Sequence, residues 1–288
     1  MMRGLIAVLT MLACVPAWAG DGFQRFEGHG GPIKGVAVSP DGAQALTASF
    51  DYSVALRNVQ RGDPTFLYGH DAAANAVAFL PAEKAFSAGD DFDAILWDLK
   101  AGEVLHRFEG HRGKVIHVST DATGRYAATS GWDGWVGLWD LQERKHLHWM
   151  KGHRGNVNAT AFSADGAFLY SGSSDGTIRR WRTATGEIDR VLVKHGFGVN
   201  HLALNEDAGW LAYGAVDGAV RALNLETDEQ IADLTADRRP ILSLVLNQAG
   251  DRLAVGDGEG YVMVIDAERW SIEHDFHAAA RGPIWALA

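Results

Sequence analysis

The stretch SGSSDGTIRRW, residues 171–181, places a serine, an aspartate and a tryptophan at fixed offsets, and His153 lies a short way upstream. Serine, histidine and aspartate form the catalytic site of many hydrolases, so these residues serve either catalysis or structure. A catalytic set occurs once in a chain, whereas a structural set recurs with the element that it stabilises. Copies of the set elsewhere in the chain would therefore indicate a structural role.

The same residue types recur along the chain with one period. Successive histidines of this series are 41 or 42 residues apart, at Gly28-His29, Gly69-His70, Gly110-His111, Gly152-His153 and His195. An acidic series runs in parallel with steps of 40 or 42 residues, at Asp51, Asp91, Asp133, Asp175, Asp217 and Glu259. Two independent markers with one period indicate a repeat array.

Each repeat contains four short segments with strand character. In the fourth repeat these are VNATAFS, FLYSGS, TIRRW and EIDRVL, with Asp-Gly and Thr-Gly turns between them. Such turns between β-rich segments are the strongest local signal for hairpins. A four-stranded sheet cannot bury both of its faces alone, so we expect the sheets to pack side by side in a ring.

The Gly-His pairs, the Asp-Gly turns and the dipeptides Trp97-Asp98 and Trp139-Asp140 resemble the WD-repeat (WD40) β-propeller family, in an exported bacterial form. The resemblance is most specific in repeats two to four and weakens afterwards, where Leu223 and Ile265 replace the tryptophan. It implies an all-β fold, a WD40-type β-propeller with six full four-stranded blades and an incomplete seventh, in a ring of seven.

In this family a histidine, a hydroxyl residue, an aspartate and a tryptophan form a hydrogen-bonded network inside each blade. The resemblance implies three full sets here: His70, Ser87, Asp91 and Trp97; His111, Thr129, Asp133 and Trp139; His153, Ser171, Asp175 and Trp181. An enzyme has no use for three such sites in one chain, so we interpret the sets as structural and expect no catalytic residue. Blades five and six, which lack the set, should be less stable.

The two ends of the repeat region predict an unfinished blade. In this family the segment before the first Gly-His pair is the outer strand of the last blade, and residues 23–27 (FQRFE) fit that role. Residues 282–288 match residues 31–37, which form an innermost strand. We expect the two strands between them to lie beyond Ala288, about 20 residues, because a propeller closes its ring.

By resemblance, the residue before each marker aspartate and the residue five after each marker histidine face the top of the ring. From these positions we predict partner-binding residues at Lys34, Phe50, Asn75, Asp90, Trp132, Asn158, Ser174, Asn200 and Trp285. Aromatic rings with polar neighbours on a solvent face are typical of protein-binding patches. The alternative is that these rings pack against neighbouring loops.

The first residues have the features of a secretory signal peptide. Arg3 precedes an apolar run at residues 5–13, and Ala17 and Ala19 fit cleavage before Gly20, which gives a signal at 1–19 and a propeller at 20–288. Residues 11–14 (MLAC) only loosely resemble a lipoprotein signal. Cleavage removes Cys14, the only cysteine, and a cysteine-free chain suits an oxidising compartment. We expect a periplasmic protein.

Composition excludes several partners. The chain has 26 basic and 36 acidic residues, so its surface repels phosphate backbones and nucleic acid is not an expected partner. No apolar run is long enough for a membrane span. The histidines His106, His146 and His148 alternate on outer strands, but no carboxylate or thiol completes a ligand set, so we expect no metal and no cofactor.

These observations favour an exported, non-enzymatic interaction scaffold that binds protein partners through its top face. One alternative is the propeller domain of a periplasmic c-type cytochrome, with a CxxCH haem domain beyond Ala288, since no CxxCH lies within the chain. A weaker alternative is a propeller enzyme with a cofactor in its central channel. Such enzymes use clusters of arginine, histidine and lysine around the channel, which the sequence alone does not assemble.

Overall fold

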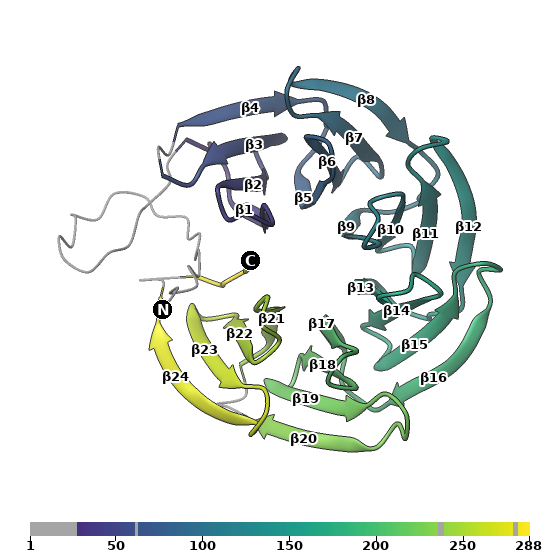
Figure 1. Ribbon diagram of the computed structural model, residues 1–288, viewed down its shortest axis with the longest axis vertical. Coiled ribbons are helices and arrows are strands. Elements are labelled where there is room, and N and C mark those ends of the chain that lie inside the picture. Colours follow the sequence, from purple (N-terminus) through teal and green to yellow (C-terminus); the bar gives the residue numbers. More distant parts are fainter. Residues whose placement is uncertain (1–27, 61–62, 236–238, 279–281) are drawn as a thin grey trace.

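The computed structural model describes residues 28–60, 63–235, 239–278 and 282–288. In these residues, 24 strands form six four-stranded antiparallel sheets, the blades, arranged around a central axis (Figure 1). In every blade the strands follow one another in chain order from the axis to the perimeter. Within the same residues, no helix has the length and apolarity needed to cross a membrane.

The first three blades come from the N-terminal half of the chain. Blade one consists of β1 (Ile33–Val38), β2 (Gln44–Ser49), β3 (Ser53–Asn58) and β4 (Pro64–Tyr68). Blade two consists of β5 (Ala74–Leu80), β6 (Lys84–Gly89), β7 (Ala94–Asp98) and β8 (Glu103–Phe108). Blade three consists of β9 (Val115–Thr120), β10 (Tyr126–Gly131), β11 (Trp135–Asp140) and β12 (Lys145–Lys151).

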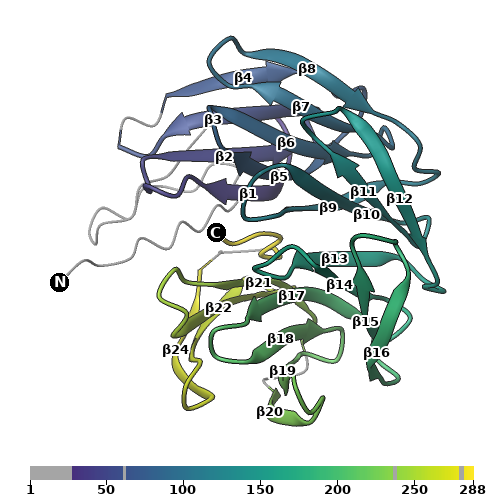
Figure 2. The same cartoon turned by 45° about the vertical axis from the view of Figure 1, so that its right-hand side comes forward.

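The other three blades complete the arrangement, and Figure 2 shows all six standing side by side around the axis. Blade four consists of β13 (Val157–Phe162), β14 (Phe168–Ser173), β15 (Thr177–Arg182) and β16 (Ile188–Lys194). Blade five consists of β17 (Val199–Asn205), β18 (Trp210–Ala215), β19 (Ala219–Asn224) and β20 (Gln230–Thr235). Blade six consists of β21 (Ile241–Leu246), β22 (Arg252–Asp257), β23 (Tyr261–Asp266) and β24 (Ser271–His277).

The turn between the second and third strands of a blade requires a left-handed residue. Gly134 and Gly176 supply it in blades three and four, with φ of 76° and 78°. A Cβ at Gly176 would lie 2.2 Å from the carbonyl oxygen of His195, so only glycine fits there. In the first two blades Tyr52 and Phe92 adopt φ of 74° and 73°, a conformation that such residues rarely take.

The hydrophobic core lies between the blades. Leu46 of blade one packs with Ile95 and Trp97 of blade two, and all three side chains are fully buried. In the same way, Tyr170 of blade four packs with Leu211 of blade five. Each blade buries its faces only against its neighbours, so the blades stabilise one another as units of an array.

The structure confirms an all-β propeller with six blades of four strands each. The expected signal peptide at 1–19 and the expected closing strand at 23–27 lie outside the described residues. Residues 282–288 were expected to form an innermost strand, and the structure assigns no strand to them. No seventh blade is present in the described part of the chain.

Residues 282–288 nevertheless lie near the axis, between blades one and six (Figure 1). The Ile284 N–H donates to the carbonyl of Asp257 at 2.9 Å, and the Ile284 carbonyl accepts from the Ser243 hydroxyl at 3.1 Å. Ile284 is 1% exposed. This segment therefore covers the inner end of blade six.

Candidate functional site

A cavity of about 590 Å³ lies on the axis, and β-bulges build its wall. The inner strand of every blade skips one residue in its pairing with the second strand. A bulge turns the skipped side chain out of the regular alternation of the strand. The six skipped residues all line the cavity: Lys34, Asn75, Ile116, Asn158, Asn200 and Leu242.

Two residues that precede marker aspartates, Phe50 and Trp132, form the rim of the cavity together with Trp285. The Phe50 N–H donates to the Pro32 carbonyl and the Trp132 N–H to the Lys114 carbonyl, both at 2.9 Å, which fixes each backbone against the loop ahead of the inner strand. The residues Phe50, Trp132 and Trp285 are 40%, 53% and 42% exposed. We call these three residues the aromatic rim.

The structure brings eight of the nine predicted partner-binding residues together around this one cavity: Lys34, Phe50, Asn75, Asp90, Trp132, Asn158, Asn200 and Trp285. The ninth, Ser174, is exposed and does not line it. The eight come from five blades and the C-terminal segment, so only the arrangement of the blades around the axis assembles them.

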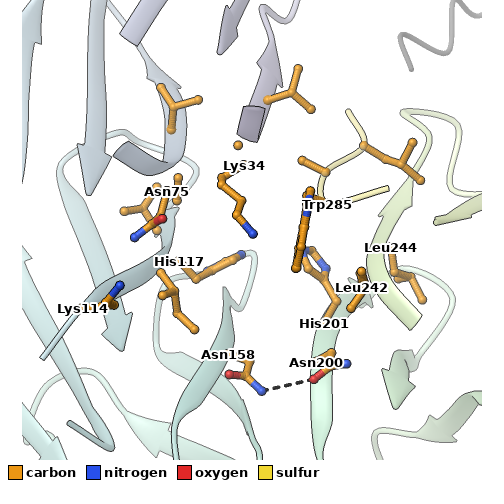
Figure 3. A pocket seen from close by; sticks show the side chains of 18 of the residues that line it. Lys34, Asn75, Lys114, His117, Asn158, Asn200, His201, Leu242, Leu244 and Trp285 are labelled. Carbon is orange, nitrogen blue, oxygen red and sulfur yellow. Dashed lines mark hydrogen bonds between the residues drawn. The ribbon is translucent and has the colours of Figure 1, made fainter. Parts of the chain in front are cut away.

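Three asparagines of the wall bind the neighbouring blade. The side-chain amide of Asn75 donates to the Val115 carbonyl at 3.0 Å, and that of Asn158 donates to the Val199 carbonyl at 2.9 Å. The side-chain amide of Asn200 donates to the Ile241 carbonyl at 2.8 Å in the same way. The amide of Asn158 also donates to the side-chain oxygen of Asn200 at 3.3 Å, a hydrogen bond that Figure 3 marks. These amides join adjacent inner strands. Because their NH₂ groups already donate to backbone carbonyls, fewer donors remain for a ligand.

The charged side chains of the cavity are unequally paired. Asp90 forms an ion pair with Lys114 and accepts from the Asn75 amide at 2.7 Å. The Lys34 ammonium lies 2.9 Å from the centre of the Trp285 ring and 5.2 Å from that of Phe50. Burial lowers the pKa of Lys34 to about 8, although the charge of Asp90 opposes this shift.

Two histidines that are not among the predicted site residues also line the cavity. His117 in β9 and His201 in β17 each follow the bulged residue, and their ring centres are 5.4 Å apart. The residue at the same position in blade four, between them, is Ala159, whose small side chain leaves room for the two rings to meet. A comparison of the residues six after each marker histidine would have found both.

Both cavity histidines are neutral at physiological pH. Burial lowers the pKa of His117 to about 3 and that of His201 to about 4. The Nδ1 atom of His117 accepts from the Thr160 N–H at 3.3 Å, which leaves the proton on Nε2. The Nδ1 atom of His201 is buried and has no hydrogen-bond partner in the described residues.

The residues of the opening stretch belong to networks inside the blades. In blade three, His111 Nδ1 donates to Asp133 at 2.8 Å, the Thr129 hydroxyl donates to His111 Nε2 at 2.7 Å, and Trp139 Nε1 donates to the same hydroxyl at 2.8 Å. The same three contacts, at 2.7 to 3.0 Å, join His70, Ser87, Asp91 and Trp97, and also His153, Ser171, Asp175 and Trp181.

This geometry leaves no free nucleophile in the networks. Ser171 is fully buried, and its hydroxyl already accepts from Trp181 while it donates to His153. A catalytic serine has to be exposed beside an oxyanion site. Burial also lowers the pKa of His153 to about 4, against the charge of Asp175, so the ring holds one fixed proton as a structural bridge.

The outer-strand histidines make separate contacts. His106 packs edge-on against Phe108, His146 stacks on Trp149, and His148 Nε2 contacts the Ala184 carbonyl at 3.2 Å. No group of three or more histidine, cysteine, aspartate or glutamate residues in the described ranges could hold a metal ion.

Comparison with known proteins places these features in one family. The family model described as WD domain, G-beta repeat matches residues 21–58, 63–98, 102–140 and 144–182, more than half of the chain. Relatives include the small ribosomal subunit protein RACK1y of Oryza sativa subsp. japonica, 34% identical over 104 residues, which is 35% of this chain and 30% of that protein.

Two further relatives are similar over comparable segments. The guanine nucleotide-binding protein subunit beta of Arabidopsis thaliana is 32% identical over 121 residues, 38% of this chain and 32% of that protein. Pre-mRNA-processing factor 17 of Homo sapiens is 27% identical over 112 residues, 37% of this chain and 19% of that protein. The match thus spans about a third or less of the length of these relatives.

Proposed function

The chain belongs to the WD40 family of WD domain, G-beta repeats, and from this premise we propose that it is an exported, non-enzymatic scaffold that binds a protein partner at its aromatic rim. The observation that carries the proposal is the gathering of Phe50, Trp132 and Trp285 around one cavity mouth, each ring about half exposed. Large aromatic side chains anchor protein interfaces because they bury much area at little entropic cost.

Charged and polar groups beside the rim support a protein ligand. Lys34 lies against Phe50 and Trp285, and Lys114 lies 5.1 Å from the centre of the Trp132 ring. Aromatic anchors surrounded by such groups are the usual composition of a binding patch. Because the serine and threonine hydroxyls of the networks are buried and occupied, the proposal assigns the chain a binding role and no catalysis.

Export to a periplasm is part of the proposal and rests on residues 1–19. Their single cation, apolar run and small residues before Gly20 fit a cleaved signal peptide. A ring of seven blades is also part of the proposal. The Ile284 carbonyl accepts from the Ser243 side chain on the inner strand of blade six, as the Ile241 carbonyl accepts from the Asn200 side chain on the inner strand of blade five, and this supports residues 282–288 as the start of a seventh inner strand.

The rim is tested by capture of partners from a periplasmic extract with wild-type protein and with the Phe50→Ala and Trp132→Ala variants. Tyr68→Ala is the matched control, because Tyr68 is an aromatic residue, 73% exposed, on the outer strand β4. We expect the wild-type protein and the Tyr68 variant to capture the same partner, and the two rim variants to lose it. Equal capture by all four proteins would contradict the proposal.

Export and the cytochrome alternative are tested by the intact mass of the protein recovered from its own cells, with a haem absorbance scan of the same sample. A mature N-terminus at Gly20 supports the signal peptide, and a retained residue 1 contradicts it. Covalent haem in the sample would contradict the simple scaffold and favour a cytochrome with a propeller domain.

A further inference from the structure

The cavity has a cation without a counterion, although the whole chain carries a net charge of −10. Asp90, the one carboxylate among its lining residues, is already paired with Lys114. Lys34 forms no ion pair with a carboxylate in the described residues, and its ammonium is held by the rings of Phe50 and Trp285. Aromatic faces attract a cation but supply no charge, so the partly buried ammonium favours an added anion.

Two neutral imidazoles lie beside this cation. In Figure 3 the side chains of Lys34, His117 and His201 point into the same part of the cavity. His117 carries its proton on Nε2, because its Nδ1 accepts from Thr160, so it can donate to a bound anion. His201 also lines the cavity, and its ring centre lies 5.4 Å from that of His117, so both imidazoles border the same space.

The remaining wall is apolar. It consists of side chains from the inner strands and the C-terminal segment: Val36, Val77, Val118, Leu244, Val245 and Leu287. A pocket of about 590 Å³ lies in the range that holds small organic ligands, which bind by an apolar body and a few placed polar groups.

We propose that the axial cavity binds a small monocarboxylate with an apolar body, its carboxylate beside Lys34 and the two histidines and its body against the valines and leucines. A single unpaired cation selects a monoanion over a dianion such as phosphate. The inference goes beyond the proposed scaffold function, because the ligand is a small molecule inside the axis and needs no protein partner. Pairing with the carboxylate would offset the burial of Lys34.

Calorimetric titration of the purified protein with octanoate tests the site, and octan-1-ol and octylamine are probes of the same chain length. We expect octanoate to bind at least about tenfold more tightly than octan-1-ol, and octylamine to bind more weakly still. The Lys34→Met variant keeps the length of the side chain and should lose this preference for octanoate. Lys151→Met is the matched control, since Lys151 lies over Trp135 on blade three, outside the cavity.

Three results would overturn the site: no heat of binding with octanoate, equal affinity for octanoate and octan-1-ol, or an unchanged preference in Lys34→Met. The comparison of the three probes on wild-type protein needs no variant, so it decides the question even where a substitution prevents folding. The result is independent of the scaffold proposal, because Trp132→Ala tests partner capture at the rim and the titration contains no partner.

Discussion

Blades three and five both consist of four antiparallel strands, but their marker residues make different contacts. In blade three, His111 connects Asp133 to Thr129, and Trp139 closes the network. In blade five the residue at the hydroxyl position is Tyr213, which stacks on His195 with ring centres 5.7 Å apart. His195 Nε2 is consequently buried without a hydrogen-bond partner in the described residues.

The aspartate of blade five has changed its partner as well. Asp217 forms an ion pair with Arg221 at 2.7 Å, and Leu223 is buried where blades two to four have tryptophan. Blade one lies between these extremes, because His29 contacts Asp51 at 2.9 Å and Thr47 at 2.7 Å. Blade five keeps its four strands without the network, so packing between blades is sufficient for the strand arrangement. We infer that the networks add stability to individual blades.

The largest effect should come from loss of the aspartate in a complete network. Asp133→Ala leaves the N–H groups of His111, Arg112 and Trp135 without an acceptor, so we expect it to lower the free energy of unfolding by about 3 kcal/mol. Asp217→Ala in blade five should cost about 1 kcal/mol, since Arg221 keeps Asp233 as a partner. Urea denaturation measures both. Equal losses would remove the distinction between the blades.

A smaller effect is expected from the hydroxyl alone. Ser171→Ala removes the acceptor of Trp181 and the donor to His153 in blade four, and we expect a loss of about 2 kcal/mol. Tyr213→Phe is the matched change in blade five, where an aromatic ring stacked on His195 stands in place of the small hydroxyl residue, and it should cost less than about 1 kcal/mol. A Tyr213 variant as unstable as the Ser171 variant would show that blade five has a substitute network.

Hydrogen exchange measures the same difference without any substitution. Amides of β10 and β14, in blades three and four, should exchange about tenfold more slowly than those of β18 and β22, in blades five and six. The reason is that local opening of a blade with a network has to break additional buried hydrogen bonds. Equal protection in all four strands would contradict a stabilising role for the networks.

The six blades could be predicted from sequence because their signals are local. The Asp-Gly turns and the recurring histidine fix the strand boundaries within one repeat, and every repeat confirms the others. The rim residues Phe50 and Trp132 could be located for the same reason, since a constant offset from the marker aspartate places them on one face.

The interior of the site could not be predicted in this way. His117 and His201 are separated by two repeats, and no local sequence signal distinguishes either histidine from the other polar residues of the strands. Only the arrangement of blades three to five around the axis brings their rings to 5.4 Å. The hydrogen bond of Asn158 between blades could not be predicted either, because the carbonyl that accepts it belongs to the next blade. Ser174 shares the offset of Trp132 but has a short side chain, and it does not line the cavity.

The smallest expected effect is a loss of folding stability in mild acid, to which His201 of blade five contributes. Its pKa is lowered to about 4 by burial, from an ordinary value of 6.5. As the pH falls through 6.5 the unfolded chain takes up a proton that the folded chain refuses until about pH 4, so stability decreases across this window. Between pH 7.5 and 6.0 the loss from one such group is about 0.8 kcal/mol.

The His201→Gln variant removes this contribution and should therefore show a smaller loss of stability between pH 7.5 and 6.0 than the wild-type protein. His274→Gln is the control, because His274 is exposed on β24 and should leave the difference unchanged. Urea denaturation at the two pH values measures the change. If the His201 variant keeps the full pH dependence of the wild-type protein, its buried imidazole does not oppose protonation, and the loss of stability in acid comes from other buried histidines, such as His117 and His153, whose pKa values are also lowered.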